Sequence, residues 1–169
     1  MQRTPHIRRA RLADLAALLA LEARFPTDRV SRTSFRRLIT RGRAQVLVCE
    51  DGEAMLGNAV VLHRAHSRAA RLYSLIVHPD HRGRGLGGLL LEAAERAAAV
   101  EGCLAMSLEV RPDNTAARQL YLKCGYAAVE TLADFYEDRS PALRLRKLLV
   151  AREPRAGALP AYEPATATV

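Results

Sequence analysis

A glycine-rich turn is the segment of this sequence best suited to chemistry. It reads Arg82-Gly83-Arg84-Gly85-Leu86-Gly87-Gly88, follows a strand-like stretch and opens a helix-like one. Free N–H groups at the start of a helix point in one direction and carry partial positive charge, so they bind anions. Glycines let the backbone approach a phosphate without a Cβ clash, and the two arginines add positive charge. The turn therefore predicts a pyrophosphate site.

Two nucleotide-binding motifs are alternatives for this turn. No lysine followed by serine or threonine is present, which excludes a Walker loop. Gly83, Gly85 and Gly88 do satisfy G-x-G-x-x-G, and Glu109 falls about 20 residues further on, where a dinucleotide site places its ribose-binding acid. Against this, residues 78–82, which include a proline, separate the glycines from the strand, and repeated βαβ units are lacking. A nucleotide-dependent oxidoreductase stays as an alternative.

The elements that must position the turn follow from periodicity and from breaking residues. The sequence predicts two helices near the start, one beginning at about Leu12 and ending before Pro26, the other capped by Ser31. Two more helices are expected at 85–100 and 114–123, and strands at 6–8, 45–50, 54–64, 71–77, 105–110, 126–132 and 142–150. The order βααβββαβαββ predicts an α/β (mixed α+β) fold. Its sheet is mostly antiparallel, with a parallel pair around the glycine-rich helix.

Length and composition indicate one domain. The 169 residues are 49% hydrophobic and 26% charged, which is ordinary for a soluble globular protein. We expect the domain to span residues 1–150 and residues 151–169, rich in alanine and proline, to be a disordered tail or linker. No apolar run reaches the roughly 18 residues of a membrane helix. Asp14 and Glu22 interrupt the one stretch that resembles a secretory signal, so a cytoplasmic location is expected.

The positive charge is concentrated at the N-terminal end. The net charge is +8, and residues 1–44 hold eleven arginines against Asp14, Glu22 and Asp28. Such a surface could attract acidic protein, RNA or a phosphorylated cofactor, but the favoured interpretation is a solvated helical face. Three widely spaced cysteines predict neither a disulfide framework nor a zinc site. His78 and His81 lack a third ligand, so no metal is expected.

The glycine-rich turn resembles the acetyl-CoA loop of the GNAT family of N-acetyltransferases. The family motif Arg/Gln-x-x-Gly-x-Gly/Ala is met by Arg82, Gly85 and Gly87, after Val77 and Pro79. Residues 108–126 resemble the second cofactor segment of the family. Residues 135–147 resemble the closing segment of the RimI-like branch, which acetylates the N-terminal alanine of a ribosomal protein. Phe135-Tyr136 replaces Tyr-Tyr there, and Ser140-Pro141 replaces an acidic residue.

The resemblance implies the GNAT fold and an enzyme that moves the acetyl group of acetyl-CoA to a primary amine, without a metal. By resemblance to the RimI-like branch, the acceptor is a protein N-terminal α-amine. Glu109 stands where that branch has its catalytic glutamate, acting as a base through water, and Tyr121 would protonate the leaving thiolate. The alternatives are that Glu109 is an exposed strand-end acid paired to an arginine and that Tyr121 is a core aromatic.

The resemblance also assigns binding residues. The main chain at 75–77 would bind pantetheine, with the N–H of Val77 as an oxyanion donor. Asn114 would cap its helix and touch the CoA arm, and Tyr136 would line the acceptor groove. The expected cofactor-binding residues are Leu75, Ile76, Val77, Arg82, Gly83, Arg84, Gly85, Leu86, Gly87, Gly88, Asn114 and Tyr121.

Other functions remain open at this stage. The acceptor could be a lysine side chain or a small-molecule amine instead of a protein N-terminus. The chain could also be a non-catalytic module that binds CoA, or one that docks on RNA or the ribosome through its arginine-rich first 44 residues. The oligomeric state is not readable from the sequence.

Overall fold

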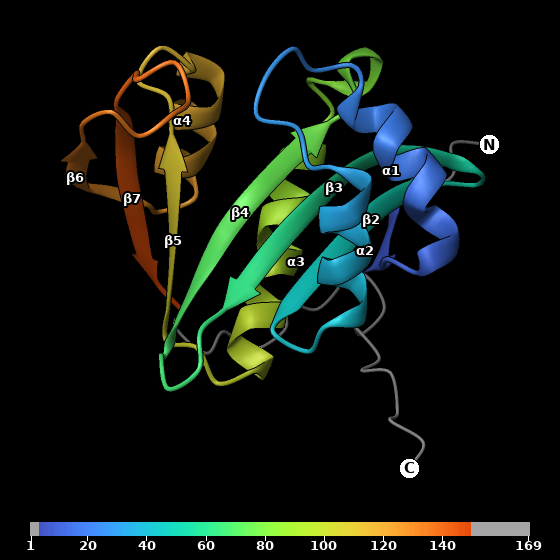
Figure 1. Ribbon diagram of the computed structural model, residues 1–169, viewed down its shortest axis with the longest axis horizontal. Helices are drawn as coiled ribbons and strands as arrows, with labels where there is room; N and C mark the ends of the chain where they lie inside the picture. The colour runs from blue at the N-terminus through green and yellow to red at the C-terminus, as the bar shows by residue number, and fades with distance from the viewer. Residues whose placement is uncertain (1–3, 150–169) are drawn as a thin grey trace.

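One seven-stranded sheet organises the protein (Figure 1). The computed structural model describes residues 4–149. The strand order is β1-β2-β3-β4-β5-β7-β6, and among these described strands β4 and β5 are the single parallel pair. This confirms the predicted mixed fold, including the parallel pair around the glycine-rich helix. The strands are β1 (His6–Arg9), β2 (Ala44–Asp51), β3 (Ala54–His63), β4 (Ala69–Val77), β5 (Ala105–Val110), β6 (Ala127–Leu132) and β7 (Ala142–Leu148).

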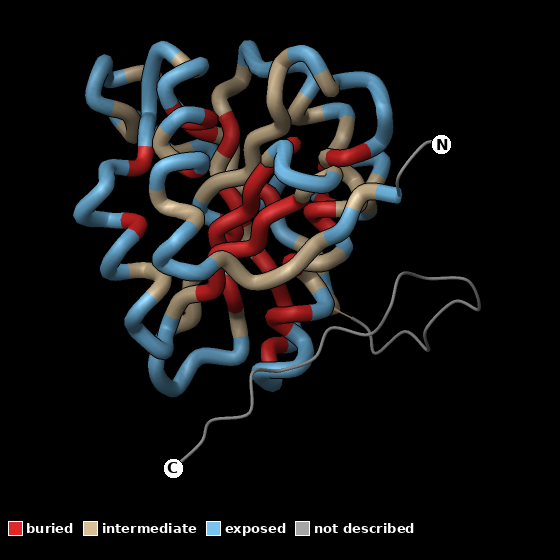
Figure 2. The backbone as a smooth tube through the Cα atoms, turned by 90° about the vertical axis from the view of Figure 1, so that its right-hand side faces the viewer, coloured by how far each residue is buried: buried red, intermediate tan, exposed pale blue. Residues whose placement is uncertain are grey.

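Four α-helices in the described part of the chain cover the two faces of the sheet. Helices α1 (Leu15–Glu22) and α2 (Arg32–Thr40) lie on one face, and α3 (Leu86–Val100) lies on the other with α4 (Thr115–Lys123) beside it. Successive side chains of a strand point to opposite faces of the sheet, so the core has two parts. In β2, Leu47 and Cys49 pack toward α3, whereas Val46 and Val48 pack toward α1 and α2. Figure 2 shows the buried backbone concentrated in this centre.

Local capping signals begin two of the helices where the sequence predicts. The Ser31 hydroxyl accepts a 3.2 Å hydrogen bond from the Ser34 N–H, and the Asn114 side chain accepts one of 3.2 Å from the Ala117 N–H. The first helix differs slightly from its prediction, since Leu12–Asp14 forms a single 3-10 turn before α1. Residues Pro79–His81 form a second such turn, which begins with the proline that follows the end of β4.

A β-bulge opens the sheet between β4 and β5. Pairing of the two strands ends at Leu72 and Leu108. On the other side of β4 the register shifts so that Val61 faces Leu72 while Val60 faces Ser74, which leaves Tyr73 unpaired. A bulge bends its strand and increases the local twist. The rest of β4 therefore turns away from β5, and no strand within residues 4–149 pairs with the β5-facing edge of β4 from Tyr73 to Val77.

Two further expectations concern the C-terminal tail and membrane-spanning helices. The tail expected at residues 151–169 lies outside the described residues. Within residues 4–149 no helix is long and apolar enough to cross a membrane.

Candidate active site

A cleft of about 890 Å³ fills the opening between β4 and β5. Its walls come from the free edge of β4, from the end of β5 and from one face of α4. The glycine-rich turn forms one end, and the loops before α2 and before β7 lie across it. The bulge at Tyr73 thus produces the cleft, and the parallel pair places the ends of both strands and the start of α3 around it.

The glycine-rich turn has the geometry of an anion site. Gly83 and Gly85 both have φ of +75°, a conformation that residues with a Cβ rarely adopt. Gly85 is the N-cap of the 15-residue helix α3, and no side chain from residues 4–149 caps this helix start. The first helical bond is made by the Leu89 N–H to the Gly85 carbonyl at 3.2 Å, so the preceding N–H groups have no partner within the helix. Leu86, Gly87 and Gly88 line the cleft, so this helix start fits a diphosphate.

The structure brings the predicted cofactor-binding residues together, with one exception. All of them line the cleft except Arg84. The Arg84 guanidinium lies 3.0 Å from Nδ1 of His81, outside the lining. The Arg82 guanidinium instead lies in the cleft wall, 5.6 Å from the ring centre of Phe25. Of the two arginines in the turn, Arg82 is therefore the one placed to face a ligand.

Tyr121 both lines the cleft and packs in the core. Its side chain is 7% exposed and meets the ring of Tyr126 edge-on, with 5.9 Å between ring centres. Burial raises the pKa of Tyr121 to about 12, because the phenolate is poorly solvated there. Tyr121 therefore is a core aromatic, which was one of the two alternatives, and it also lines the cleft, with its hydroxyl protonated at neutral pH.

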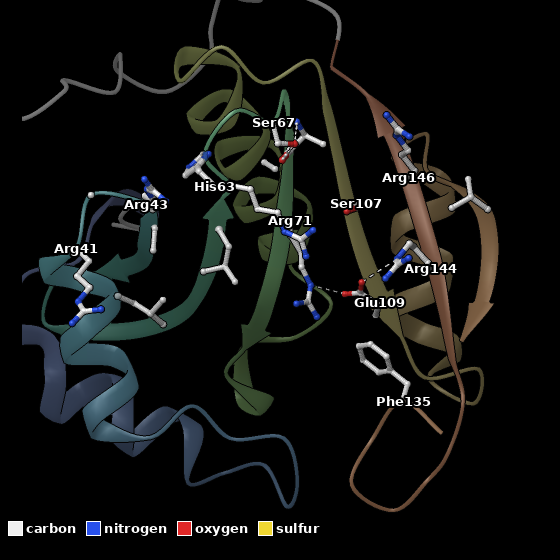
Figure 3. Close-up of a pocket in the computed structure, with 18 of the residues that line it drawn as sticks. Arg41, Arg43, His63, Ser67, Arg71, Ser107, Glu109, Phe135, Arg144 and Arg146 are labelled. Carbon is white, nitrogen blue, oxygen red and sulfur yellow. Dashed lines mark hydrogen bonds and ion pairs between the residues drawn. The ribbon is translucent and has the colours of Figure 1, made fainter. Parts of the chain in front are cut away.

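Glu109 is held between two arginines. Its Oε2 accepts a 2.8 Å hydrogen bond from Nε of Arg71, and its Oε1 accepts one of 3.2 Å from Nε of Arg144 (Figure 3). The Glu109 side chain is only 6% exposed. The alternative interpretation of Glu109 as an exposed strand-end acid paired to an arginine is therefore wrong about the exposure, whereas the pairing with arginine is present. Both arginines belong to neighbouring strands, and this clamp fixes the carboxylate at the cleft.

A second cavity of about 1310 Å³ adjoins the cleft. It lies on the α2 side of the sheet, between α2 and the β6–β7 hairpin (Figure 3). Arg71, Glu109 and Phe135 line both cavities. Glu109 therefore stands at the boundary, where a group held in the cleft can meet a group that enters from the second cavity.

Arg111 joins the loops that border the cleft. Its guanidinium donates to Asp28 at 3.1 Å and to Asp138 at 2.9 Å, and it stacks on the ring of Tyr136 at 3.9 Å. Hydrogen bonds from Ser140 and Arg111 lower the pKa of Asp138 to about 2. Tyr136 lines the cleft and is not among the residues that line the second cavity.

Sequence reasoning missed several of these residues. Arg71, Arg144 and Arg111 matter only through partners more than 25 residues away, which no local motif reveals. Glu22 was also missed: it lines the cleft, burial raises its pKa, and its Oε2 accepts a 2.9 Å bond from the Val30 N–H.

The two histidines near the turn have structural contacts. Nδ1 of His78 accepts a 3.2 Å hydrogen bond from the Asp80 N–H, and its ring meets that of His81 edge-on. Within residues 4–149 no three His, Cys, Asp or Glu side chains are grouped to hold a metal ion.

Comparison with known proteins relates this arrangement to acetyltransferases. The model of the acetyltransferase (GNAT) family matches residues 14–126. An acetyltransferase of Yersinia enterocolitica is 35% identical over 86 residues, which are 51% of this chain and 60% of that protein. The chain therefore aligns with somewhat more than half the length of this curated relative.

Solved structures share the fold at low sequence identity. A ribosomal-protein alanine N-acetyltransferase of Escherichia coli superposes with a TM-score of 0.77 at 24% identity, covering 90% of this chain and 99% of that one. A spermidine N-acetyltransferase of Vibrio cholerae superposes with a TM-score of 0.75 at 19% identity, covering 86% and 94%. At these identities the likeness extends to the fold, and the names cover both protein and small-amine acceptors.

Proposed function

We propose that this chain, which belongs to the acetyltransferase (GNAT) family, transfers the acetyl group of acetyl-CoA to a primary amine. Within the family we place it in the RimI-like branch, with a protein N-terminal α-amine as acceptor and the cytoplasm as its location. The domain that does this spans residues 1–150. The observation that carries the proposal is that the anion-binding start of α3, Tyr121 and Glu109 line one cleft.

Residues along the cleft would hold the diphosphate, the pantetheine arm and the thioester of acetyl-CoA, which would supply the activated acetyl group. The unpaired N–H groups that open α3, together with Arg82, would hold the diphosphate. The free edge of β4 from Leu75 to Val77 would hydrogen-bond the pantetheine arm, as a strand does. Asn114 would contact the arm at the start of α4. The N–H of Val77 would stabilise negative charge on the thioester oxygen.

Glu109 would remove the proton from the attacking amine. At pH 7 an α-amine of pKa near 8 is neutral in about one molecule in ten, and a lysine amine of pKa near 10.4 in about one in 2,500. A modest base is therefore sufficient for an N-terminus. Arg71 and Arg144 hold the carboxylate in place, and a water molecule would relay the proton to it.

Tyr121 would give its proton to the departing sulfur. The phenol is protonated at every physiological pH because burial raises its pKa to about 12. Tyr121 lines the cleft from the helix that Asn114 caps, so the proposed cofactor arm would run past this residue.

A small polyamine is the second candidate acceptor, since a spermidine N-acetyltransferase shares the fold. The second cavity argues against it. Seven arginines and two glutamates line that cavity, and such a lining repels a polycation.

Release of CoA thiol from acetyl-CoA, followed with peptides, spermidine and a peptide blocked at its N-terminus but bearing lysine, tests the proposal. We expect turnover with free peptide N-termini and much less with the other two. Turnover of spermidine alone would overturn the acceptor assignment. A complete lack of turnover, with CoA bound, would instead indicate a non-catalytic CoA-binding module.

A further inference from the structure

The lining of the second cavity has an excess of positive charge. Seven of its lining residues are arginines, from α2, the α2–β2 loop, the β3–β4 end of the sheet and β7. Figure 3 shows Arg41, Arg43, Arg71, Arg144 and Arg146 around the opening, with Glu109 on its inner wall. Glu109 and Glu130 are the acidic residues of this lining.

Both glutamates are already neutralised. Glu109 pairs with Arg71 and Arg144, and Glu130 pairs with Arg144 at 2.7 Å. The other five arginines make no side-chain hydrogen bond or ion pair with any residue in 4–149, and all five are exposed. These five, which we term the free arginines, are Arg37, Arg41, Arg43, Arg64 and Arg146. They come from three separate segments of the chain, at residues 37–43, 64 and 146, and converge on one cavity.

A cluster of unpaired like charges around one cavity is unfavourable unless a partner of opposite charge binds there. Guanidinium groups bind carboxylates and phosphates through paired hydrogen bonds. The cavity, at about 1310 Å³, also exceeds the range of about 300–1,000 Å³ typical of small-ligand sites. Its lining therefore fits an extended chain that carries several anionic groups.

We propose that the acceptor is an acidic peptide, whose N-terminal amine reaches Glu109 while carboxylates of the following residues contact the free arginines. This inference rests on the proposed function, since it assumes that the amine approaches from the second cavity. Each residue of an extended peptide spans about 3.3–3.6 Å, so residues two to four extend outward from Glu109 along the arginine-lined wall. RNA phosphates are the rival occupant, and the test below includes them.

Three peptides with a common N-terminal alanine and a common neutral C-terminal fluorophore form the test. They differ at positions two to four, which are all aspartate, all serine or all lysine. Their fluorescence anisotropy is measured with the CoA-saturated protein, and their acetylation with acetyl-CoA. A fluorescent single-stranded RNA is titrated in parallel. The key variant is Arg41→Gln/Arg43→Gln/Arg64→Gln. Its matched control is Arg32→Gln/Arg36→Gln/Arg68→Gln, which removes the same charge from neighbouring segments outside the cavity.

The acidic peptide is expected to bind at least tenfold tighter than the serine peptide, and the lysine peptide to bind weakest. The key variant should bind the acidic peptide about tenfold more weakly than wild type, and its affinity for the serine peptide should change by less than about twofold. The control variant should keep the wild-type affinity for both peptides. Raising salt from about 0.1 M to about 1 M, which shortens the Debye length from about 10 to about 3 Å, should remove the preference.

Equal binding of the three peptides would overturn the inference, even if all are acetylated. RNA binding that the key variant abolishes, without any preference among the peptides, would assign the cavity to RNA and overturn it as well. Tight, arginine-dependent binding of an acidic peptide that is never acetylated would support the acidic partner and refute the proposed function instead. Failure of the acidic-peptide inference and failure of the proposed acetyltransferase function thus give different results.

Discussion

The carboxylate of Glu109 accepts a 2.8 Å hydrogen bond from Nε of Arg71 at the point where β4 and β5 separate. Arg71 faces Ser107 in the parallel pair, and Glu109 lies two residues further along β5 on the same face. Arg71 precedes the last β4–β5 pair and Glu109 follows it, so the two residues place an ion pair with a buried carboxylate beside the opening cleft. The carboxylate is held rigidly, as a proton acceptor must be.

Removal of the Glu109 charge should slow the reaction without unfolding the protein. We expect Glu109→Gln to lower kcat by about 100-fold or more, because general-base catalysis contributes about 10²–10⁴-fold, and to leave CoA affinity unchanged. Glu130→Gln is the matched control, since Glu130 also pairs with Arg144 but is exposed and lies outside the cleft. Steady-state kinetics and CoA titration measure both. Equal activity of Glu109→Gln and wild type would remove Glu109 from the mechanism.

Tyr121 should act as an acid that does not titrate in the working range. Its pKa of about 12 means that the active, protonated form persists as pH rises, so no loss of rate from this group is expected below about pH 11. Tyr121→Phe should lower kcat about 10- to 100-fold at all pH values and keep the CoA Kd within about twofold. An alkaline decline in wild-type rate centred near pH 10 that disappears in Tyr121→Phe would contradict this assignment.

Arg111 should govern acceptor binding by holding two loops together. Its bonds join Asp28, before α2, to Asp138 and Tyr136, before β7. We expect Arg111→Gln to raise KM for the acceptor about tenfold with a smaller change in kcat, and to speed amide exchange in residues 24–30 and 133–141. Arg96→Gln, on the exposed face of α3, is a control that also breaks an ion pair. Unchanged exchange in both loops would show that the pairs do not hold them.

Gly85 should be needed for its backbone conformation. Its φ of +75° disfavours a residue with a Cβ, and the left-handed conformation costs such a residue about 1–2 kcal/mol. In Gly85→Ala the free turn should relax to avoid this strain, and CoA binding must then restore the left-handed conformation. CoA affinity should therefore fall about 5- to 30-fold. Gly42→Ala, where the added Cβ meets nothing within 4 Å, is the control. An undiminished CoA affinity in Gly85→Ala would show that this conformation is not required.

The helices and strands could be predicted from the sequence because local residues mark where they begin and end. Ser31 and Asn114 begin helices through their own side chains, Pro79 ends a strand, and the glycine-rich turn marks the start of α3. Each of these depends on neighbours a few residues away. The order of elements and the mixed sheet follow from them.

The catalytic clamp and the cavities depend instead on register. Arg71 reaches Glu109 across 38 residues and Arg144 across 35, and neither pairing has a local signature. The bulge at Tyr73 decides where the sheet opens, and nothing in the sequence around it marks a bulge. The free arginines are likewise dispersed along the chain, and only the folded sheet brings them to one cavity.

Calorimetric titration of the protein with CoA, with pantetheine as the truncated ligand, tests the role of the glycine-rich helix start most directly. If the N–H groups that open α3 hold the diphosphate, CoA should bind with a stoichiometry of one per chain, and pantetheine, which lacks the diphosphate, should bind at least 100-fold more weakly. No heat with CoA, or equal affinity for the two ligands, would contradict the account.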